Sequence, residues 1–206
     1  MQLKYGCNPH QSFASIEPIE AGTAPVEVLN GNPSYINLMD ALNACQLVAE
    51  ARQATGLAAA ASFKHVSPAG AAVACELDPA LAQAYEVPGV ELTDAALAYV
   101  RARGADPKCS FGDFAALSDP VDTSTAKFLK GVVSDGIVAP DFEPEALDIL
   151  KGKKGGGFIV LRADAGFRAP QQEAREVFGL RLVQDRNNRM VCSADLDEVI
   201  CGELTE

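Results

Sequence analysis

The sequence lacks a long apolar run and an ordered cysteine pattern. No stretch of the 206 residues approaches the roughly 18 consecutive apolar residues that a membrane-spanning helix needs. The first residues, MQLKYGCNPHQ, have no apolar core and no small-residue cleavage pattern, so we expect no export signal. The six cysteines are scattered without a CxxC pair, which argues against disulfides or a zinc knuckle and predicts reduced, mostly buried thiols in the cytoplasm.

Positive charge and several familiar motifs are also scarce. A net charge of -11 disfavours nucleic acid as a partner, because Lys and Arg supply affinity for phosphates. GxSxG, HExxH and GxGxxG are absent, so serine hydrolases, zincins and Rossmann oxidoreductases are not favoured. The HxE…PCxxC signature of zinc deaminases is missing too, and we expect no metal site.

What remains is the composition of a folded chain, with 48% apolar and 22% charged residues. Three prolines interrupt residues 1–30, which predicts an extended entry segment. From Ser34 to about Thr55 the spacing predicts an amphipathic helix that ends at Gly56. Its apolar face is expected to contain Tyr35, Leu38, Met39, Leu42, Cys45, Gln46 and Ala49.

Strand-like and helix-like segments then alternate. LAAAASF, GDFAAL, GVVSDGIVAP and FIVLRAD predict buried strands. Helices are predicted after Pro68 (AGAAVAC), over 93–103, from Asp122 to Lys130 and from Glu143-Pro144. LRLVQD and RMVCS predict a hairpin with its turn at Arg186 to Asn188. Such alternation predicts an α/β sandwich with a mixed sheet.

Lys64 and His65 are the first candidates for chemistry. They are placed at the carboxyl end of a predicted strand and before a predicted helix, the edge at which open α/β sheets bind ligands. A neutral imidazole beside a cation combines a general base with a group that stabilises negative charge. The alternative is that His65 is a hydrogen-bonded core residue.

Three further segments each allow a functional and a structural interpretation. In SFGDF, Phe111 and Gly112 can belong to a site, or Phe111 can be core and Asp113 a solvated strand start. Asp135 interrupts an apolar strand, and a buried acid is costly unless it is paired or meets a ligand, so we favour function. KGKKGGG lacks the phosphate-loop pattern and is interpreted as an exposed connection.

These segments together resemble the transformylase domain of the bifunctional enzyme that formylates AICAR (aminoimidazole carboxamide ribonucleotide) and cyclises the product to IMP. The resemblance extends over nearly the whole chain and lies in the order of the family's segments: LKYGCNPHQ, LNGNPSYINLMDALNACQLV, ASFKHVSPAGAAVA, RARGAD, SFGDFAALSD, VSDGIVAP, EALDILKGKK and FGLRLVQDRNN. It implies a cytidine deaminase-like α/β/α sandwich without zinc, used twice in tandem.

The resemblance also implies roles for single residues. Lys64 and His65 match the catalytic pair of the family. The substrate-binding positions are matched by Lys4, Tyr5, Asn37, Gly112 and Asp135. Lys108 and Phe111 match the folate-binding wall. Lys4 stands where the family usually has arginine, and lysine offers a compact charge instead of a two-pronged fork. Lys108 replaces a more usual apolar residue.

The implied reaction transfers a formyl group from 10-formyltetrahydrofolate to the 5-amino group of AICAR in the cytoplasm. The chain would form the N-terminal part of the transformylase, with an entry segment over about 1–33 and the first deaminase-like unit over 34–206. We expect the chain to lack the cyclohydrolase domain and the second unit, and therefore to act as a homodimer or with a complementing C-terminal half. Two alternatives stay open: a non-catalytic binding or assembly subunit, and formyl phosphate as the donor.

Overall fold

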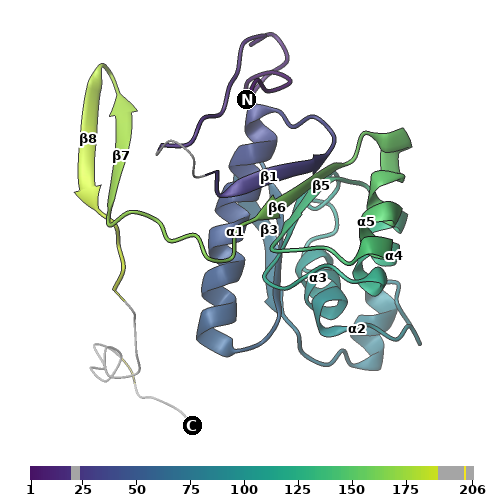
Figure 1. Cartoon of the computed structure of the whole chain (residues 1–206). Coiled ribbons are helices and arrows are strands. Elements are labelled where there is room, and N and C mark those ends of the chain that lie inside the picture. Colours follow the sequence, from purple (N-terminus) through teal and green to yellow (C-terminus); the bar gives the residue numbers. More distant parts are fainter. Residues whose placement is uncertain (20–23, 190–201, 203–206) are drawn as a thin grey trace. The chain divides into compact units, whose positions relative to one another are not determined.

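The structure, a computed structural model, describes residues 1–19, 24–189 and 202. It divides into two compact units, Met1–Ala165 and Gly166–Glu206. The first unit contains a six-stranded sheet with its helices, and the second contains a two-stranded hairpin (Figure 1). The assignment of residues 1–206 to the first part of a larger domain stays a prediction.

The six-stranded sheet is mixed, which confirms the predicted α/β class. Its strands follow the order β1-β6-β5-β4-β2-β3. Strands β4, β5 and β6 run parallel, whereas β1, β2 and β3 each pair antiparallel with a neighbour. The strand bounds are β1 Val26–Asn30, β2 Ala59–Lys64, β3 Ser67–Val73, β4 Asp113–Leu117, β5 Ser134–Ala139 and β6 Ile159–Ala163.

Four helices confirm the predicted ones: α1 Tyr35–Thr55, α3 Asp94–Gly104, α4 Thr123–Gly131 and α5 Pro144–Lys151. Each of the first three begins where a polar side chain accepts a hydrogen bond from the first turn, at Ser34, Thr93 and Asp122. Helix α1 ends at Gly56, which adopts the left-handed conformation at φ 73°. A short helix, α2 Pro79–Ala84, was not predicted. Within the described ranges, no helix combines the length and apolar character needed to cross a membrane.

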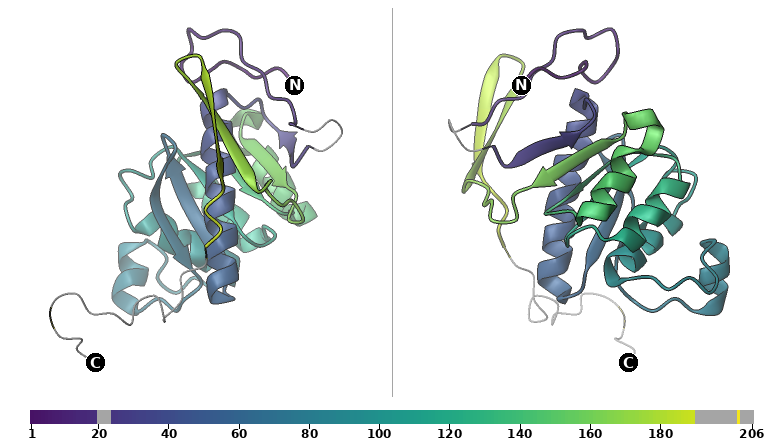
Figure 2. Two further views of the ribbon diagram at one scale, coloured as in Figure 1. Left: turned by 90° about the vertical axis from the view of Figure 1, so that its left-hand side faces the viewer. Right: turned by 45° about the vertical axis from the view of Figure 1, so that its right-hand side comes forward.

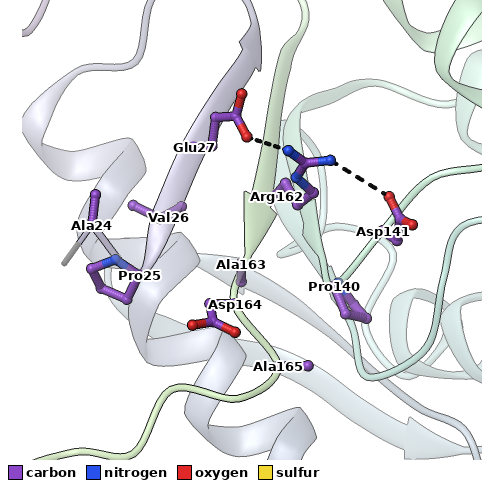
Figure 3. A pocket seen from close by; sticks show the side chains of 10 residues that line it. All are labelled: Ala24, Pro25, Val26, Glu27, Pro140, Asp141, Arg162, Ala163, Asp164 and Ala165. Carbon is purple, nitrogen blue, oxygen red and sulfur yellow. Dashed lines mark hydrogen bonds and ion pairs between the residues drawn. The ribbon is translucent and has the colours of Figure 1, made fainter. Parts of the chain in front are cut away.

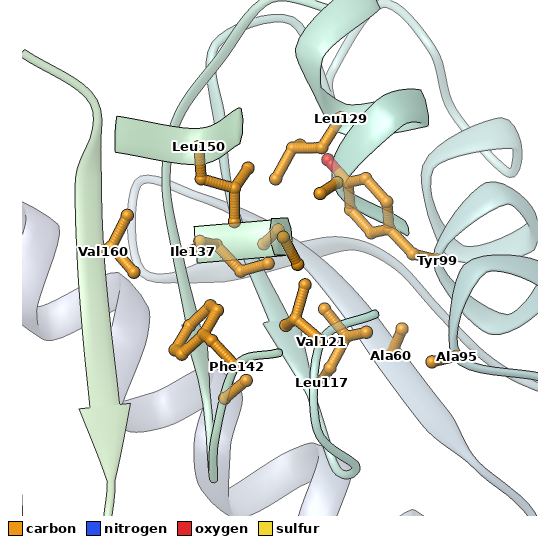
Figure 4. Close-up of a cluster of buried hydrophobic side chains, with 14 of the residues drawn as sticks. Ala60, Ala95, Tyr99, Leu117, Val121, Leu129, Ile137, Phe142, Leu150 and Val160 are labelled. Carbon is orange, nitrogen blue, oxygen red and sulfur yellow. The ribbon is translucent and has the colours of Figure 1, made fainter. Parts of the chain in front are cut away.

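The core consists of two layers, one on each face of the sheet. Ala60, Leu117 and Ile137 face a cluster built with α3, α4 and α5 (Figure 4). The next residues along the strands, such as Ala61 and Val138, face a second cluster built with α1. Because alternate strand residues point to opposite faces, helices cover both sides of the sheet (Figures 1 and 2). The first unit is therefore an α/β/α sandwich.

The helix predicted after Pro68 is wrong, because these residues form strand β3. β3 pairs antiparallel with β2 along its whole length. An ideal Cβ on Gly70 would lie 2.1 Å from the carbonyl oxygen of Ala102, so the bare glycine lets β3 approach the backbone of α3. A run of small residues supports a helix in isolation, but here it serves close packing of an edge strand.

The predicted apolar face of α1 is also wrong in detail. The buried apolar residues are Leu38, Ala41, Ala44 and Val48, whereas Tyr35, Gln46 and Ala49 are exposed. The positions of the alanines Ala41 and Ala44 therefore indicate the buried face of α1 better than the positions of Tyr35 and Gln46 do. Small side chains allow α1 to pack close to the strands of the sheet.

The second unit contains β7 Gln172–Val177 and β8 Leu180–Asp185, joined by a turn at Phe178-Gly179. The strand predicted over LRLVQD is confirmed as β8, and its partner in the structure is the preceding strand β7. The predicted pairing with RMVCS falls mostly on residues 190–193, outside the described residues.

Candidate functional site

All nine residues predicted for the site lie at one end of the strands of the six-stranded sheet, and this end is called the edge of the site below. Strand β2 ends there at Lys64, and β4, which runs antiparallel to β2, begins there after the loop from Lys108 to Gly112. β5 runs parallel to β4 and therefore also begins at this edge, where it carries Asp135. The site therefore lies at the amino ends of the parallel strands, and not at the carboxyl ends where open α/β sheets usually bind ligands. The segment after His65, which was expected to be a helix, is strand β3.

The N-terminal segment and the start of α1 lie at the same edge. α1 leads into β2 through the turn at Gly56, so the helix and the strand run in opposite directions. The first turn of α1 therefore lies on the side where β2 ends. The amide of Lys4 donates to the carbonyl of Pro33 at 3.0 Å, and the amide of Tyr35 donates to the carbonyl of Tyr5 at 2.9 Å. These backbone bonds hold residues 4 and 5 against the beginning of the helix.

Lys64 is the centre of a group of charges. Its Nζ donates to the carbonyl oxygen of Gly112 at 2.6 Å and lies 3.9 Å from Oδ2 of Asp135. Nζ of Lys154 lies closer to the same carboxylate, at 2.5 Å from Oδ1. The carboxylate of Asp135 is therefore paired, as the sequence required, but its side chain is 41% exposed and not deeply buried. Lys64, Gly112 and Asp135 are brought together.

His65 occupies a hairpin turn between β2 and β3. The turn consists of His65 and Val66, at φ 54° and 63°, and both are in the left-handed region. His65 is exposed, so the alternative that it is a core residue is wrong. An exposed imidazole next to a fixed ammonium group can take a proton from a ligand.

Asp40 of α1 lies beneath this turn. Its Oδ1 accepts a hydrogen bond from the amide of Val66 at 2.6 Å, and the residue is only 6% exposed. Burial raises the pKa of Asp40, while the Val66 hydrogen bond and the nearby charges of His65 and Lys64 oppose the rise. Asp40 was not among the predicted site residues, although an acid between the buried positions Leu38 and Ala41 was a usable signal.

A buried polar network supports the loop before β4. Asp113 is fully buried, so the expectation of a solvated strand start is wrong. Its carboxylate accepts hydrogen bonds from Ser62 Oγ at 2.6 Å, Tyr99 OH at 2.9 Å and Arg103 Nη1 at 3.0 Å. Burial raises the pKa of Asp113 despite these donors. Arg103 also donates to the carbonyls of Ser110 and Val133, which fixes the loop around Gly112.

Phe111 and Lys108 project from the same loop. Phe111 is 64% exposed, so the alternative that it belongs to the core is wrong. Lys108 is exposed as well, and its carbonyl accepts a hydrogen bond from the amide of Phe111 at 3.3 Å. The loop thus offers an exposed apolar ring and an exposed cation three positions apart in sequence.

Asn37 and the N-terminal segment form a second group at this edge. Oδ1 of Asn37 accepts hydrogen bonds from the amide and hydroxyl of Ser34, so this oxygen is already used in capping α1. Nζ of Lys4 lies 5.6 Å from the ring centroid of Tyr5. A cavity of about 430 Å³ borders this segment and is lined by Gly6, Cys7, Gln11, Phe13, Ala14, Ser15 and Tyr35.

Another cavity, of about 380 Å³, lies at the opposite edge, where β5 and β6 end (Figure 3). Arg162 forms ion pairs there with Glu27 and Asp141. The carboxyl ends of parallel strands are a common ligand position. The lining contains no Lys, His, Cys or Ser, so we assign the chemistry to the edge that carries Lys64 and His65.

Two remaining expectations concern cysteines and the glycine-rich loop. Cys7, Cys75 and Cys109 are exposed. The expectation of mostly buried thiols is therefore wrong for the described cysteines. KGKKGGG forms a short 3₁₀ turn, Lys153–Gly156, in which Lys153 is buried and donates to the carbonyl of Val132. No cluster of three potential metal ligands occurs within residues 1–19, 24–189 and 202.

Comparison with known proteins identifies the relatives of the chain. The sequence model of the AICARFT/IMPCHase bienzyme family matches residues 1–205. The bifunctional purine biosynthesis protein PurH of Thermoanaerobacter sp. is 35% identical over 199 residues, which cover 95% of this chain and 33% of the relative. PurH of Synechococcus elongatus is 36% identical over 192 residues, covering 91% and 33%.

A third relative, PurH of Staphylococcus saprophyticus, is 32% identical over 207 residues, which cover 99% of this chain and 37% of the relative. The chain therefore spans about a third of the length of the curated relatives it matches.

Proposed function

Because the chain belongs to the AICARFT/IMPCHase bienzyme family, we propose that it carries part of a site that formylates AICAR in purine biosynthesis. One observation carries the proposal. Lys64 Nζ is held by the Gly112 carbonyl beside His65, which is exposed on a left-handed turn at the sheet edge. Consecutive residues thus carry an ammonium group with a fixed position and an exposed imidazole, which supports the proposal.

His65 would act as the general base. The 5-amino group of AICAR is conjugated with the ring and its carboxamide, so it is a poor nucleophile until its proton is removed. Neutral imidazole can take this proton as the nitrogen attacks the formyl carbon. The Lys64 ammonium would stabilise the oxyanion of the tetrahedral species or protonate the leaving folate nitrogen. Holding both substrates side by side supplies much of the remaining acceleration.

The other predicted residues would bind the two substrates. Gly112 and Asp135 would contact the carboxamide of AICAR, while Lys4 and Tyr5 would contact the nucleotide, with Asn37 supporting them. The exposed ring of Phe111 fits the aromatic part of 10-formyltetrahydrofolate. The exposed cation of Lys108 fits the carboxylates of the folate tail. No residue in this proposal holds zinc.

The site would be completed by further protein. The chain spans about a third of the length of its relatives, and a second copy or a C-terminal half would supply the remaining contacts to the substrates. The proposal places the reaction in the cytoplasm, with AICAR and folate as small-molecule partners. Formyl phosphate remains the alternative donor.

The test removes each reacting group in the intact native assembly. We expect Lys64→Ala and His65→Ala each to lower kcat by at least about 100-fold, because each removes a group that acts in the transition state. Lys127→Ala, an exposed lysine of α4, is the matched control and should keep full turnover. Circular dichroism checks folding.

Near-normal formyl transfer in either variant would contradict the assignment. Absence of transfer by the unmodified assembly would instead favour a non-catalytic binding or assembly subunit. Assays with each formyl donor in turn decide between folate and formyl phosphate.

A further inference from the structure

The turn that presents His65 is strained. His65 and Val66 both have positive φ, and left-handed conformations are unfavourable for residues with a Cβ, most of all for a β-branched one. Two-residue hairpin turns of this hand normally use Asn-Gly or Gly-Gly, because glycine carries no such penalty. Lys64 and Ser67 pair directly across the turn, so His65 and Val66 alone form its loop.

Asp40 is the side chain that holds this turn from below. It belongs to α1, whereas the turn joins β2 to β3, so the contact links two elements that are separated by 26 positions in sequence. The bond is short, at 2.6 Å from Val66 N to Asp40 Oδ1, as expected for a charge-assisted hydrogen bond. The carboxyl is nearly buried, which is costly unless the group is hydrogen-bonded or paired, and the Val66 amide supplies the hydrogen bond.

We propose that Asp40 is a positioning residue that fixes the left-handed turn and thereby sets the direction of Lys64 and His65. The proposal rests on the function proposed above for that pair, but the contact itself does not depend on it. Asp40 does not need to touch substrate. It acts through the Val66 amide, which follows directly after His65 in the chain.

The structural arm of the test measures the Val66 amide in the 206-residue chain by NMR. We expect this amide to be shifted downfield and protected from hydrogen exchange by at least about tenfold. Asp40→Ala should abolish both effects, while Asp40→Asn, which keeps an acceptor oxygen, should retain most of the protection. Glu50→Ala, an exposed acid on the same helix, should change nothing. Equal protection in Asp40→Ala and the unmodified chain would overturn the proposal.

The functional arm measures formyl transfer in the intact native assembly. We expect Asp40→Ala to lower kcat on the order of 100-fold with little change in KM for AICAR, since a displacement of about 1 Å has this effect. Asp40→Asn should recover kcat to within about threefold of the unmodified protein, as expected for a geometric role. Equal losses in both variants would overturn the positioning role.

A second substitution separates positioning from general destabilisation. Val66→Gly removes the strain at φ 63°, so in the Asp40→Ala background it should restore part of kcat. Failure of Val66→Gly to recover any turnover would show that the loss arises elsewhere and would overturn the proposal. If the unmodified assembly transfers no formyl group, the proposed function fails, and the amide measurements decide the role of Asp40 alone.

Discussion

At the residue scale, Gly112 meets two separate constraints. Its φ is 73°, and an ideal Cβ at this position would lie 3.1 Å from Nζ of Lys64. The carbonyl of the same residue accepts the hydrogen bond from that ammonium. Gly112 therefore shapes the backbone and leaves room for the cation at the same time.

We expect Gly112→Ala to lower the free energy of unfolding by about 1 kcal/mol, because alanine is disfavoured in the left-handed region. Turnover of the intact assembly should fall further, by about tenfold, because the new methyl group displaces the Lys64 ammonium. Gly131→Ala is the matched control, since an added Cβ there meets nothing within 4 Å. Urea denaturation and initial-rate assays measure the two effects. A loss of turnover no larger than that of the control would contradict the role of Gly112.

Asp113 provides a second test at this scale. Its carboxylate is fully buried and forms an ion pair with Arg103 at 3.0 Å. Asp113→Ala leaves the buried donor groups of Ser62, Tyr99 and Arg103 without their acceptor, so the free energy of unfolding should fall on the order of 3 kcal/mol. Asp106→Ala, which truncates a partly exposed acid in the loop before β4, should cost much less. A loss below about 1 kcal/mol would indicate that the pair is dispensable.

The raised pKa of Asp113 also predicts a pH dependence. Burial raises this pKa above 3.8, so the folded state holds the proton more tightly than the unfolded state does. The contribution of Asp113 to stability is therefore fully present below pH 3.8 and decreases as the pH rises through the raised pKa. Urea denaturation of the unmodified chain and of Asp113→Asn between acid and neutral pH measures the difference. An advantage of the unmodified chain that grows with pH would contradict this sign.

At the element scale, close packing in β3 outweighs the intrinsic helix preference of its alanine-rich sequence. Gly70 allows the backbone of this edge strand to approach α3, since a Cβ would lie 2.1 Å from Ala102 O. We expect Gly70→Ala to lower the free energy of unfolding by about 2 kcal/mol through overpacking. Ala71→Ser, an exposed position on the same strand, should be nearly neutral. Thermal denaturation of both variants measures the difference. Equal midpoints would contradict the packing argument.

This strand also explains which elements could be predicted from the sequence. Elements with a local signal were found: capped helices such as α1 and α4, and strands that follow an apolar run, such as β6. β3 was predicted as a helix because AGAAVAC has no strand-like signal, and its conformation depends on pairing with β2. α2 was missed because it is short and has no buried residue.

The candidate site follows the same rule. Lys64, Gly112 and Asp135 were each noticed from an unusual local pattern, and the fold brings them together. Asp40 was missed although it lies between buried positions of α1, and Lys154 was missed because KGKKGGG was interpreted as an exposed connection. Their importance arises only when α1 and the 3₁₀ turn come to the edge where β2 ends. Contacts between distant segments are the part that local patterns do not contain.

At the scale of the whole molecule, charge is distributed unevenly. The chain has a net charge of -11, yet Lys4, Lys64, Lys108 and Lys154 all come to the edge where the candidate site lies. Local cations in an acidic protein direct an anionic ligand to one place, because the remaining surface repels it. Such an arrangement agrees with the small anionic substrates proposed above better than with a long polyanion.

The two compact units differ in how their elements are supported. In the described part of Gly166–Glu206 the sheet has only two strands, and nearly all of their side chains are exposed. Val177 and Leu180 face each other across the hairpin, on the same face as Leu182, and Phe178 at the turn is fully exposed. A two-stranded hairpin without a covered apolar face is at best marginally stable in water.

We therefore expect amides of β7 and β8 to exchange at least about 100-fold faster than those of β4 and β5, which open only on global unfolding. Leu182→Lys should leave the unfolding of the first unit unchanged, because Leu182 is exposed in the hairpin. Ile137→Ala should lower its stability by about 3 kcal/mol, because Ile137 is fully buried in the core. Hydrogen exchange followed by NMR, together with urea denaturation, measures both effects. Equal protection of the two sheets would show that the hairpin gains support from contacts that its exposed side chains do not reveal.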